Sequence, residues 1–290
     1  MINTIRNVHT SMKLNKRFRI PFQGIWKHTY FEEKKLSEDD ECVFLFEEGN
    51  KQSYDADYLM YIRRKYRKAI LIFLYWNPAE YIDKRYVSYV NQHFDYVISF
   101  DPEDCKKHDW IHYSGIYSKP EGMMNHDSPE YDVFFAGHNK GRLELLRNIY
   151  AILKNAGLKC DFYISEVEDC SDDGIHYNEY LPYSELLEHI KNSKAILEVL
   201  QDCQHGSTLR LMEAMVYERV LITNNTNVFS ERYFSEEQFY VFKGIESIDV
   251  EKIKNKCDNV GNFSYNNLLS PKKFLAFLEE LYENFPVNVS

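Results

Sequence analysis

The sequence predicts an α/β protein with two Rossmann-like domains, whose parallel sheets face each other across a cleft. Short apolar runs that fit buried strands alternate with helical patterns in both halves of the chain, which indicates right-handed β-α-β crossovers. Between the two series, residues 117–130 contain two prolines, one glycine and little periodicity, as expected of a linker. The chain has 290 residues, which is enough for two domains of ordinary size.

These patterns also set the predicted domain boundaries. We expect an N-terminal Rossmann-like domain at residues 1–118, a linker at 119–130 and a C-terminal domain at 131–269. The terminal segment 270–290 contains an amphipathic helix, which is expected to pack back on the N-terminal domain.

The first half starts with residues 1–40, where Arg17–Phe22 fits a short edge strand broken by proline. Cys42–Phe46 is a continuous apolar run that ends in an acidic turn, which fits a buried parallel strand. Asp101 precedes Pro102, and proline is favourable in the first turn of a helix. The other elements predicted here are helices at 57–66 and 79–92 and strands at 69–75, 96–100 and 111–113.

The second half repeats the alternation of strands and helices. Its predicted strands are 131–136, 159–164, 195–200, 220–223 and 238–242. Its predicted helices are 142–155, 184–192, a short one that follows Ser207, and 271–284.

Composition and charge exclude several classes of function. The 44% hydrophobic and 28% charged residues are those of a soluble globular protein rather than a disordered one. The net charge of −10 argues against nucleic acid as a partner, because a surface that follows phosphates needs excess lysine and arginine. Met1–Arg19 lacks the apolar core of a signal peptide, and the longest apolar run, Ile70–Trp76, is far shorter than the ~20 residues that span a bilayer. Since the six cysteines are scattered, as in a reducing compartment, we expect a cytoplasmic protein.

The stretch 204–215 joins a small-residue turn to a short helix. Gly206 and Ser207 put no bulk in front of the free N–H groups, so the helix N-terminus offers an anion site. Arg210 and Glu213 follow on one polar stripe of the helix. A nucleoside diphosphate needs both features, because its phosphates need donors and its ribose hydroxyls need an acceptor. The alternative is an ordinary amphipathic helix with a solvated Arg–Glu pair.

A second candidate anion site follows the predicted strand at 131–136. The turn from Gly137 to Arg142 places glycines, two cations that include Lys140, and a helix N-terminus at the carboxyl end of a strand. Ligands bind at that position in open parallel sheets. The turn is neither G-x-G-x-x-G nor a P-loop, so dinucleotide and NTPase functions are not indicated. The alternative is a glycine turn capped by surface charges.

The spacing Gly206-x-x-x-Arg210-x-x-Glu213-Ala214, followed by the strand Val220–Thr223, resembles the donor-site motif of GT-B glycosyltransferases. The resemblance is closest to short bacterial enzymes that build lipopolysaccharide or capsular glycans. It extends upstream through Tyr131–Gly137 and Tyr180–Tyr183. In the first half a weaker likeness is carried by Tyr75–Pro78 and Ser99–Asp101.

The resemblance implies a glycosyltransferase that moves a sugar from a nucleotide-sugar donor to a cell-surface glycan or glycolipid. The donor would bind the C-terminal domain and the acceptor the N-terminal domain. Glu213 would accept hydrogen bonds from the ribose, and Arg210 would bind the diphosphate or orient Glu213. Tyr183 would stack on the base or, alternatively, serve as the hydrophobic staple of a proline-fixed helix entry. The predicted donor-binding residues are Glu213, Arg210, Gly206, Ser207, Thr208, His205, Gly137, Lys140, Arg142 and Tyr183.

No metal ion or other cofactor is expected. A fixed guanidinium can offset the charge that develops on the nucleotide leaving group. The nearest approach to a metal-binding acidic motif is Asp172-Asp173, in a loop predicted to be exposed to solvent.

The catalytic base is not singled out. An inverting transferase needs a carboxylate or histidine to take the proton of the acceptor hydroxyl, and Asp101, Glu80 and His28 are the candidates. Asp101 fits the N-cap of the following helix equally well. Two other functions therefore stay open: a nucleotide-sugar epimerase on the same fold, and a catalytically silent binding module.

A compact basic patch, Arg63–Lys68, stands out in this acidic protein. Such a patch attracts anionic lipids with about 1 kcal/mol per charge near the surface, which would give peripheral contact with the inner face of the cell membrane. The alternative is a solvated helix face, since no apolar stripe of membrane-binding size accompanies the patch.

Overall fold

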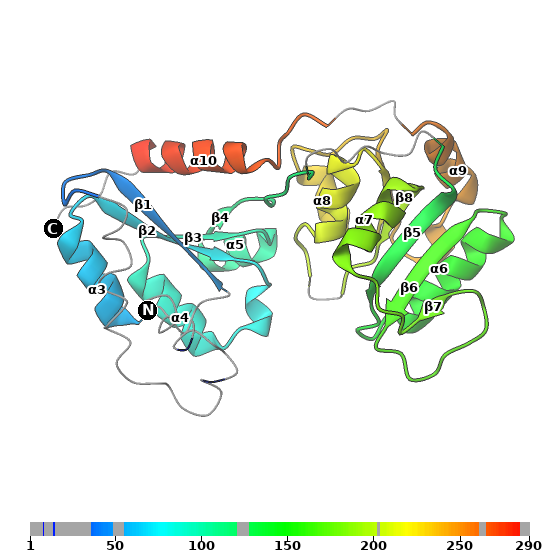
Figure 1. The fold of residues 1–290 in the computed structure, drawn as a ribbon, viewed down its shortest axis with the longest axis horizontal. Helices are drawn as coiled ribbons and strands as arrows, with labels where there is room; N and C mark the ends of the chain where they lie inside the picture. Colours follow the sequence, from blue (N-terminus) through cyan, green and yellow to red (C-terminus); the bar gives the residue numbers. More distant parts are fainter. Residues whose placement is uncertain are drawn as a thin grey trace. The chain divides into compact units, whose positions relative to one another are not determined.

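A computed structural model describes Val8, Leu14 and residues 36–48, 55–120, 128–201, 204–260 and 265–284. The chain divides into two compact units, one of residues up to Tyr113 together with those from Ala276 onward, the other of Ser114–Leu275. Each unit contains a parallel sheet of its own (Figure 1). Each also has its own buried apolar side chains. Three predicted features lie outside the described residues: the edge strand 17–22, His28, and residues 121–127 of the linker.

The first unit is built on a parallel sheet with the strand order β1-β2-β3-β4. The strand β2 (Ala69–Tyr75) is buried at all seven positions, as its continuous apolar sequence predicts. Leu71 and Phe73 join a core that also contains residues of α3 and α4. The other elements are β1 (Cys42–Glu47), α3 (Ala56–Lys65), η3 (Ala79–Tyr81), α4 (Lys84–His93), β3 (Tyr96–Ser99), α5 (Pro102–His108) and β4 (Ile111–His112).

The terminal helix α10 (Pro271–Asn284) lies on the face of this sheet opposite α3 and α4 (Figure 1). The ring centroids of Tyr113 and Phe277 are 4.8 Å apart, and the Tyr282 hydroxyl donates to the carbonyl oxygen of Lys68 at 3.2 Å. Successive side chains of a strand point to opposite faces of a sheet. Since Leu71 and Phe73 point toward α3 and α4, the residues of β2 that alternate with them point toward α10. These residues are buried as well: Ile70, Ile72 and Leu74.

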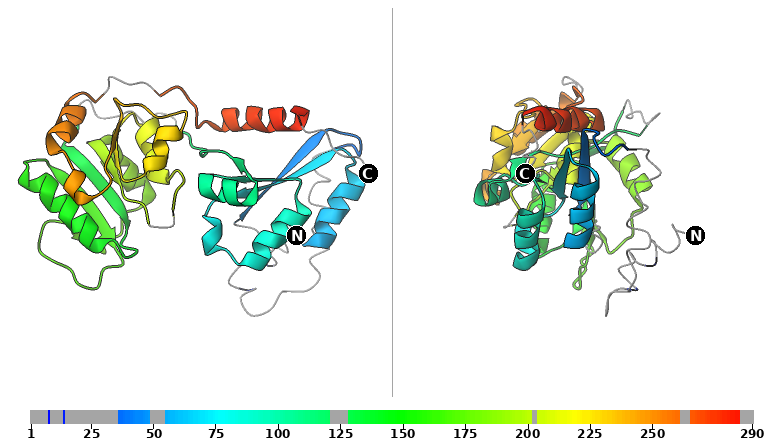
Figure 2. Two further views of the ribbon diagram at one scale, coloured as in Figure 1. Left: turned by 180° about the vertical axis from the view of Figure 1, so that it is seen from behind. Right: turned by 90° about the vertical axis from the view of Figure 1, so that its left-hand side faces the viewer.

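The second unit is built on a parallel sheet with the strand order β10-β9-β8-β5-β6-β7. The chain begins in the sheet with β5, proceeds to one edge, and then crosses to β8 on the other side, so the strand order reverses between β5 and β8. Helices α6 and α9 pack on one face and α7 and α8 on the other (Figures 1 and 2). The elements are β5 (Tyr131–His138), α6 (Leu143–Asn155), β6 (Cys160–Ser165), β7 (His176–Tyr177), α7 (Tyr183–Lys191), β8 (Ser193–Glu198), α8 (Leu209–Val216), β9 (Val220–Thr223), η4 (Thr226–Ser230), β10 (Phe239–Val241), η5 (Ile245–Ser247) and α9 (Val250–Asp258).

The predicted α/β class with two parallel sheets is confirmed, and the differences are local. The helix predicted at 79–92 is interrupted because Asp83 accepts a hydrogen bond from the Arg85 N–H at 2.8 Å and so starts α4. The sequence pattern does not predict β7, which has two residues, or α9, where only Ile253 and Cys257 are buried. The strand predicted at 195–200 is shifted to Ser193–Glu198, so a carboxylate ends β8.

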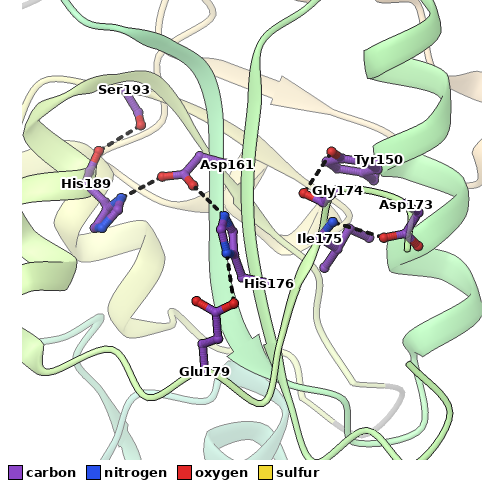
Figure 3. A network of polar contacts seen from close by, with 9 residues as sticks. All are labelled: Tyr150, Asp161, Asp173, Gly174, Ile175, His176, Glu179, His189 and Ser193. Carbon is purple, nitrogen blue, oxygen red and sulfur yellow. Dashed lines mark hydrogen bonds and ion pairs between the residues drawn. The ribbon is translucent and has the colours of Figure 1, made fainter. Parts of the chain in front are cut away.

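A polar network joins β6, β7 and α7 (Figure 3). Asp161 of β6 is only 3% exposed, and its carboxylate lies 2.6 Å from Nδ1 of His189 and 4.0 Å from Nε2 of His176. Nδ1 of His176 lies 3.1 Å from the Glu179 carboxylate, and its ring stacks on Tyr163. One buried acid therefore holds an edge strand and a covering helix against the sheet.

Candidate functional site

Two predicted anion-binding stretches meet at the carboxyl edge of the six-stranded sheet, where its strand order reverses. β5 leads into α6 on one face and β8 leads toward α8 on the other, so both helices begin at this edge. In open parallel sheets, ligands bind at such a reversal. Arg142, from the first stretch, and Glu198, beside the second, are close enough for the charge of each to affect the pKa of the other.

Glu213 lies in α8 with no exposed surface. One carboxylate oxygen forms an ion pair with Nη1 of Arg210, and the other accepts the Tyr183 hydroxyl at 3.1 Å. Burial raises the pKa of Glu213, because it disfavours the charged form, while Arg210 and Tyr183 oppose that shift. A solvated Arg–Glu pair, the alternative left open by the sequence, is wrong.

Tyrosine hydroxyls extend this network away from the helix. The Tyr183 hydroxyl lies 2.9 Å from that of Tyr117, which in turn hydrogen-bonds Tyr217. Burial raises the pKa of Tyr183 to about 12, although its side chain is 47% exposed. Tyr183 is thus the partner of Glu213 that is accessible from outside, at the first residue of α7.

The turn before α8 is fixed by polar side chains of the following loop. The carbonyl oxygens of His205 and Gly206 accept hydrogen bonds from Asn227 at 3.0 Å and Asn225 at 3.4 Å. The hydroxyl oxygen of Ser207 lies 2.5 Å from that of Tyr233. The backbone of the turn is therefore held in place without occupying the helix N-terminus.

Thr208 is the N-cap of α8, and its hydroxyl accepts the Leu211 N–H at 3.3 Å. Within the described part of the chain, the N–H groups of Leu209 and Arg210 have no hydrogen-bond partner. Free N–H groups and the helix dipole together favour an anion at this position.

The stretch after β5 also turns a helix N-terminus toward this edge. A Cβ added at Gly137 would lie 3.2 Å from the Phe135 ring and 3.4 Å from Nη2 of Arg142, so a side chain would fit there only if the Phe135 ring moved by a few tenths of an ångström. Arg142 lies over the Phe135 ring and donates to the His138 carbonyl oxygen at 3.3 Å, while its Nε has no partner within the described residues. Lys140 is exposed at the turn, and α6 has no side-chain cap.

Glu198 is the residue of this edge that sequence reasoning missed. It ends β8, is 2% exposed, and accepts hydrogen bonds from the hydroxyls of Thr208 and Thr223. Burial raises the pKa of Glu198, and these hydroxyls together with Arg142 oppose the shift. The signal that could have found it is a single charged residue within the apolar run 195–200.

The candidates for a catalytic base belong to the first unit. The Asp101 carboxylate is the N-cap of α5, where it accepts the N–H groups of Glu103 at 2.9 Å and Asp104 at 3.3 Å. Glu80 is exposed on η3. The Asp101 carboxylate therefore caps a helix, whereas the Glu80 carboxylate has no capping role.

The basic patch Arg63–Lys68, which covers the end of α3 and the turn after it, is partly neutralised. Arg63 pairs with Asp95 at 2.9 Å, and the last two cations of the patch pair with the acids Glu38 and Glu41. Its attraction for anionic lipids is therefore smaller than five free charges would give. None of the helices in the described ranges is long and apolar enough to cross a membrane.

Acidic side chains do not gather into a metal-binding cluster in the part of the chain that the structure describes. Asp172 is exposed, whereas the Asp173 carboxylate accepts the Ile175 N–H at 3.0 Å and the Tyr177 hydroxyl at 2.7 Å. This pair organises its own loop, and metal independence stays a prediction.

The fold is similar to that of known glycosyltransferases. The catalytic domain of starch synthase IV from Arabidopsis thaliana, bound to ADP and acarbose, matches with a TM-score of 0.52 and 12% identity over 89% of this chain and 75% of that one. The accessory secretory proteins 1, 2 and 3 of Streptococcus pneumoniae match with a TM-score of 0.52 and 8% identity, over 90% of this chain and 57% of that one. A UDP-forming trehalose-phosphate synthase from Burkholderia vietnamiensis matches with a TM-score of 0.48 and 10% identity, over 97% of this chain and 82% of that one.

These similarities concern the fold. The structural neighbours include GT-B glycosyltransferases, and the α/β chain with two parallel sheets matches them. In sequence, no protein-family model and no curated protein matches the chain.

Proposed function

We propose that this chain is a cytoplasmic, metal-independent glycosyltransferase, which moves a sugar from a nucleotide-sugar donor to a cell-surface glycan of the lipopolysaccharide or capsule type. The observation that carries the proposal is the position of Glu213. It is a fully buried carboxylate one turn inside a helix whose N-terminus begins at the strand-order reversal. Such a helix supplies donors for a diphosphate and an acceptor for a ribose within a few ångströms of each other.

In this proposal the diphosphate binds the free N–H groups at the start of α8, with Arg142 and Lys140 facing it from the turn before α6. The ribose hydroxyls bind Glu213. Because Glu213 has no exposed surface, the donor must displace one of its present partners, and Tyr183 is the exposed one. Its hydroxyl holds the place of a ribose hydroxyl, and its ring is then free to stack on the base.

The chemical step needs charge compensation on the leaving nucleotide. Arg210 and Arg142 are cations beside the proposed diphosphate position, and a fixed guanidinium stabilises developing negative charge. Among the residues that the structure describes, Glu80 remains a candidate for the catalytic base, since the Asp101 carboxylate caps α5. That capping role is the observation that favours a second function, a catalytically silent nucleotide-sugar-binding module.

The first experiment is a thermal-shift panel with UDP, GDP, CMP, dTDP and their sugars. A ligand at about 100 times its Kd stabilises by about 2.7 kcal/mol, which is easily measured. We expect one nucleotide to stabilise the wild type and Glu213→Ala to lose that shift. Glu251→Ala, an exposed carboxylate on α9, is the matched control and should keep it.

A shift that survives in Glu213→Ala would remove Glu213 from the site. With the nucleotide identified, turnover separates the two functions. A transferase consumes the nucleotide sugar when a glycan acceptor is added, whereas the silent module binds it and converts nothing.

A further inference from the structure

The buried carboxylate of Glu198 connects three segments at the proposed site. Its oxygens accept the hydroxyls of Thr208, the N-cap of α8, and of Thr223, the last residue of β9. The backbone N–H of Thr208 also donates to it. Arg142, at the start of α6, is the cation that its charge attracts.

The hydrogen bonds to Glu198 also fix the direction in which the two threonine hydroxyls accept. A threonine hydroxyl has one proton to donate, and both hydroxyls give theirs to Glu198. Their lone pairs are thereby turned to backbone N–H groups: Thr208 accepts from Leu211 at 3.3 Å, and Thr223 accepts from Asn225 at 2.9 Å. One carboxylate therefore orients the first turn of α8 and the loop that follows β9.

The loop after β9 returns to the same place. Asn225 donates to the carbonyl oxygen of Gly206 at 3.4 Å, which fixes the turn that precedes α8. Glu198 thus acts on that turn from both ends, through Thr208 and through Thr223. It is 2% exposed and so has no surface of its own to offer a ligand.

Resting on the proposed function, we propose that Glu198 is a positioning residue for the diphosphate. It holds the N-terminus of α8 and the guanidinium of Arg142 in one phosphate-facing arrangement without touching the ligand. A neutral glutamine keeps the size of the side chain, but its amide cannot accept both threonine hydroxyls equally and does not attract Arg142.

The test measures the Kd of inorganic pyrophosphate at a temperature where every variant is folded by circular dichroism. Glu198→Gln is expected to weaken binding about 10-fold, which corresponds to about 1.4 kcal/mol. Asp161→Asn is the matched control, because it also neutralises a buried carboxylate of the same unit (Figure 3). It should lower the thermal midpoint and leave the Kd unchanged.

A double-mutant cycle then tests the route through Arg142. Arg142→Gln alone should weaken pyrophosphate binding. Glu198→Gln should then raise the Kd by a smaller factor in the Arg142→Gln background than in the wild type. If Glu198→Gln does not fold, Thr223→Val keeps the shape of the threonine, removes one of the two hydroxyls, and should weaken binding about 3-fold.

The outcomes are distinct. An unchanged Kd in Glu198→Gln, or in Thr223→Val where that variant stands in, overturns the inference and leaves the proposed function standing. Equal weakening in Asp161→Asn also overturns it, since the effect would then be general. A wild type that binds no pyrophosphate overturns the proposed phosphate site and the inference with it.

Discussion

Glu198 and Asp161 are both buried in the six-stranded sheet, but they are satisfied by different kinds of partner. Glu198 ends β8 at the carboxyl edge and accepts the hydroxyls of Thr208 and Thr223. Asp161 is the second residue of β6 and contacts the imidazole of His189, with the imidazole of His176 farther away. Each is less than 5% exposed.

The difference lies in what each carboxylate organises. The partners of Asp161 come from a covering helix and an edge strand, so the contact holds layers of the fold together. The partners of Glu198 are the residues at which backbone turns begin beside the strand-order reversal. Burial of an acid therefore does not identify a site by itself; the segments that it orients do.

The largest effect expected from breaking this comparison is on stability. Asp161→Ala leaves His189 without its carboxylate partner and His176 with Glu179 alone, and losing a partner of buried polar groups costs about 2 kcal/mol. Urea unfolding monitored by circular dichroism measures the loss. Pyrophosphate binding by the folded variant should be that of the wild type, and a weaker Kd would break the distinction between the two acids.

A smaller effect concerns pH and Glu198. Burial raises its pKa in the folded state, so the stability that this group contributes is fully present below its unfolded pKa, near 4.5, and is lost as the pH rises through the folded pKa. Glutamine does not titrate. The stability difference between wild type and Glu198→Gln should therefore shrink as the pH rises above 4.5.

Urea unfolding at a series of pH values gives this difference directly. Since the other acids are common to both proteins, their contributions cancel. A difference that grows with pH would mean that the hydrogen bonds and Arg142 outweigh burial, and Glu198 would then be a stabilising ion rather than a strained one.

The smallest effect is expected at a third buried acid, Asp101 in the first unit. Asparagine is as good an N-cap as aspartate, so Asp101→Asn should keep the stability of α5 within about 0.5 kcal/mol. If the carboxylate only caps the helix, sugar transfer should stay within about 3-fold of the wild type. A loss of 100-fold or more at unchanged thermal midpoint would instead identify Asp101 as the base.

The sequence is most informative where one residue type carries a local signal. The apolar run 69–75 coincides with β2, and proline after Asp101 marks the start of α5. The sequence does not predict elements whose local pattern is short. The strand β7 has only two residues, and α9 has only two buried side chains, which is too few to show a helical period. Asp83 interrupts a helical pattern through a hydrogen bond that periodicity does not register.

The polar site was only half visible in the sequence. The spacing of Arg210 and Glu213 on one helix is local, and their ion pair follows from it. The contacts of Glu198 with Thr223 and of Glu213 with Tyr183 join residues 25 and 30 positions apart. They depend on β8 lying between β5 and β9, and strand order is a property of the whole fold.

The return of α10 to the first unit has a consequence for biosynthesis. Its helix is translated after the sheet on which it lies, and most of Ser114–Leu275 is made in between. At about 5–20 residues per second, the ribosome needs of the order of ten seconds or more to make the intervening unit. During that interval α10 is not yet made, so it does not cover the face of β2 that Ile70, Ile72 and Leu74 form. The nascent chain therefore exposes an apolar surface, which a chaperone bound at the ribosome would be suited to cover.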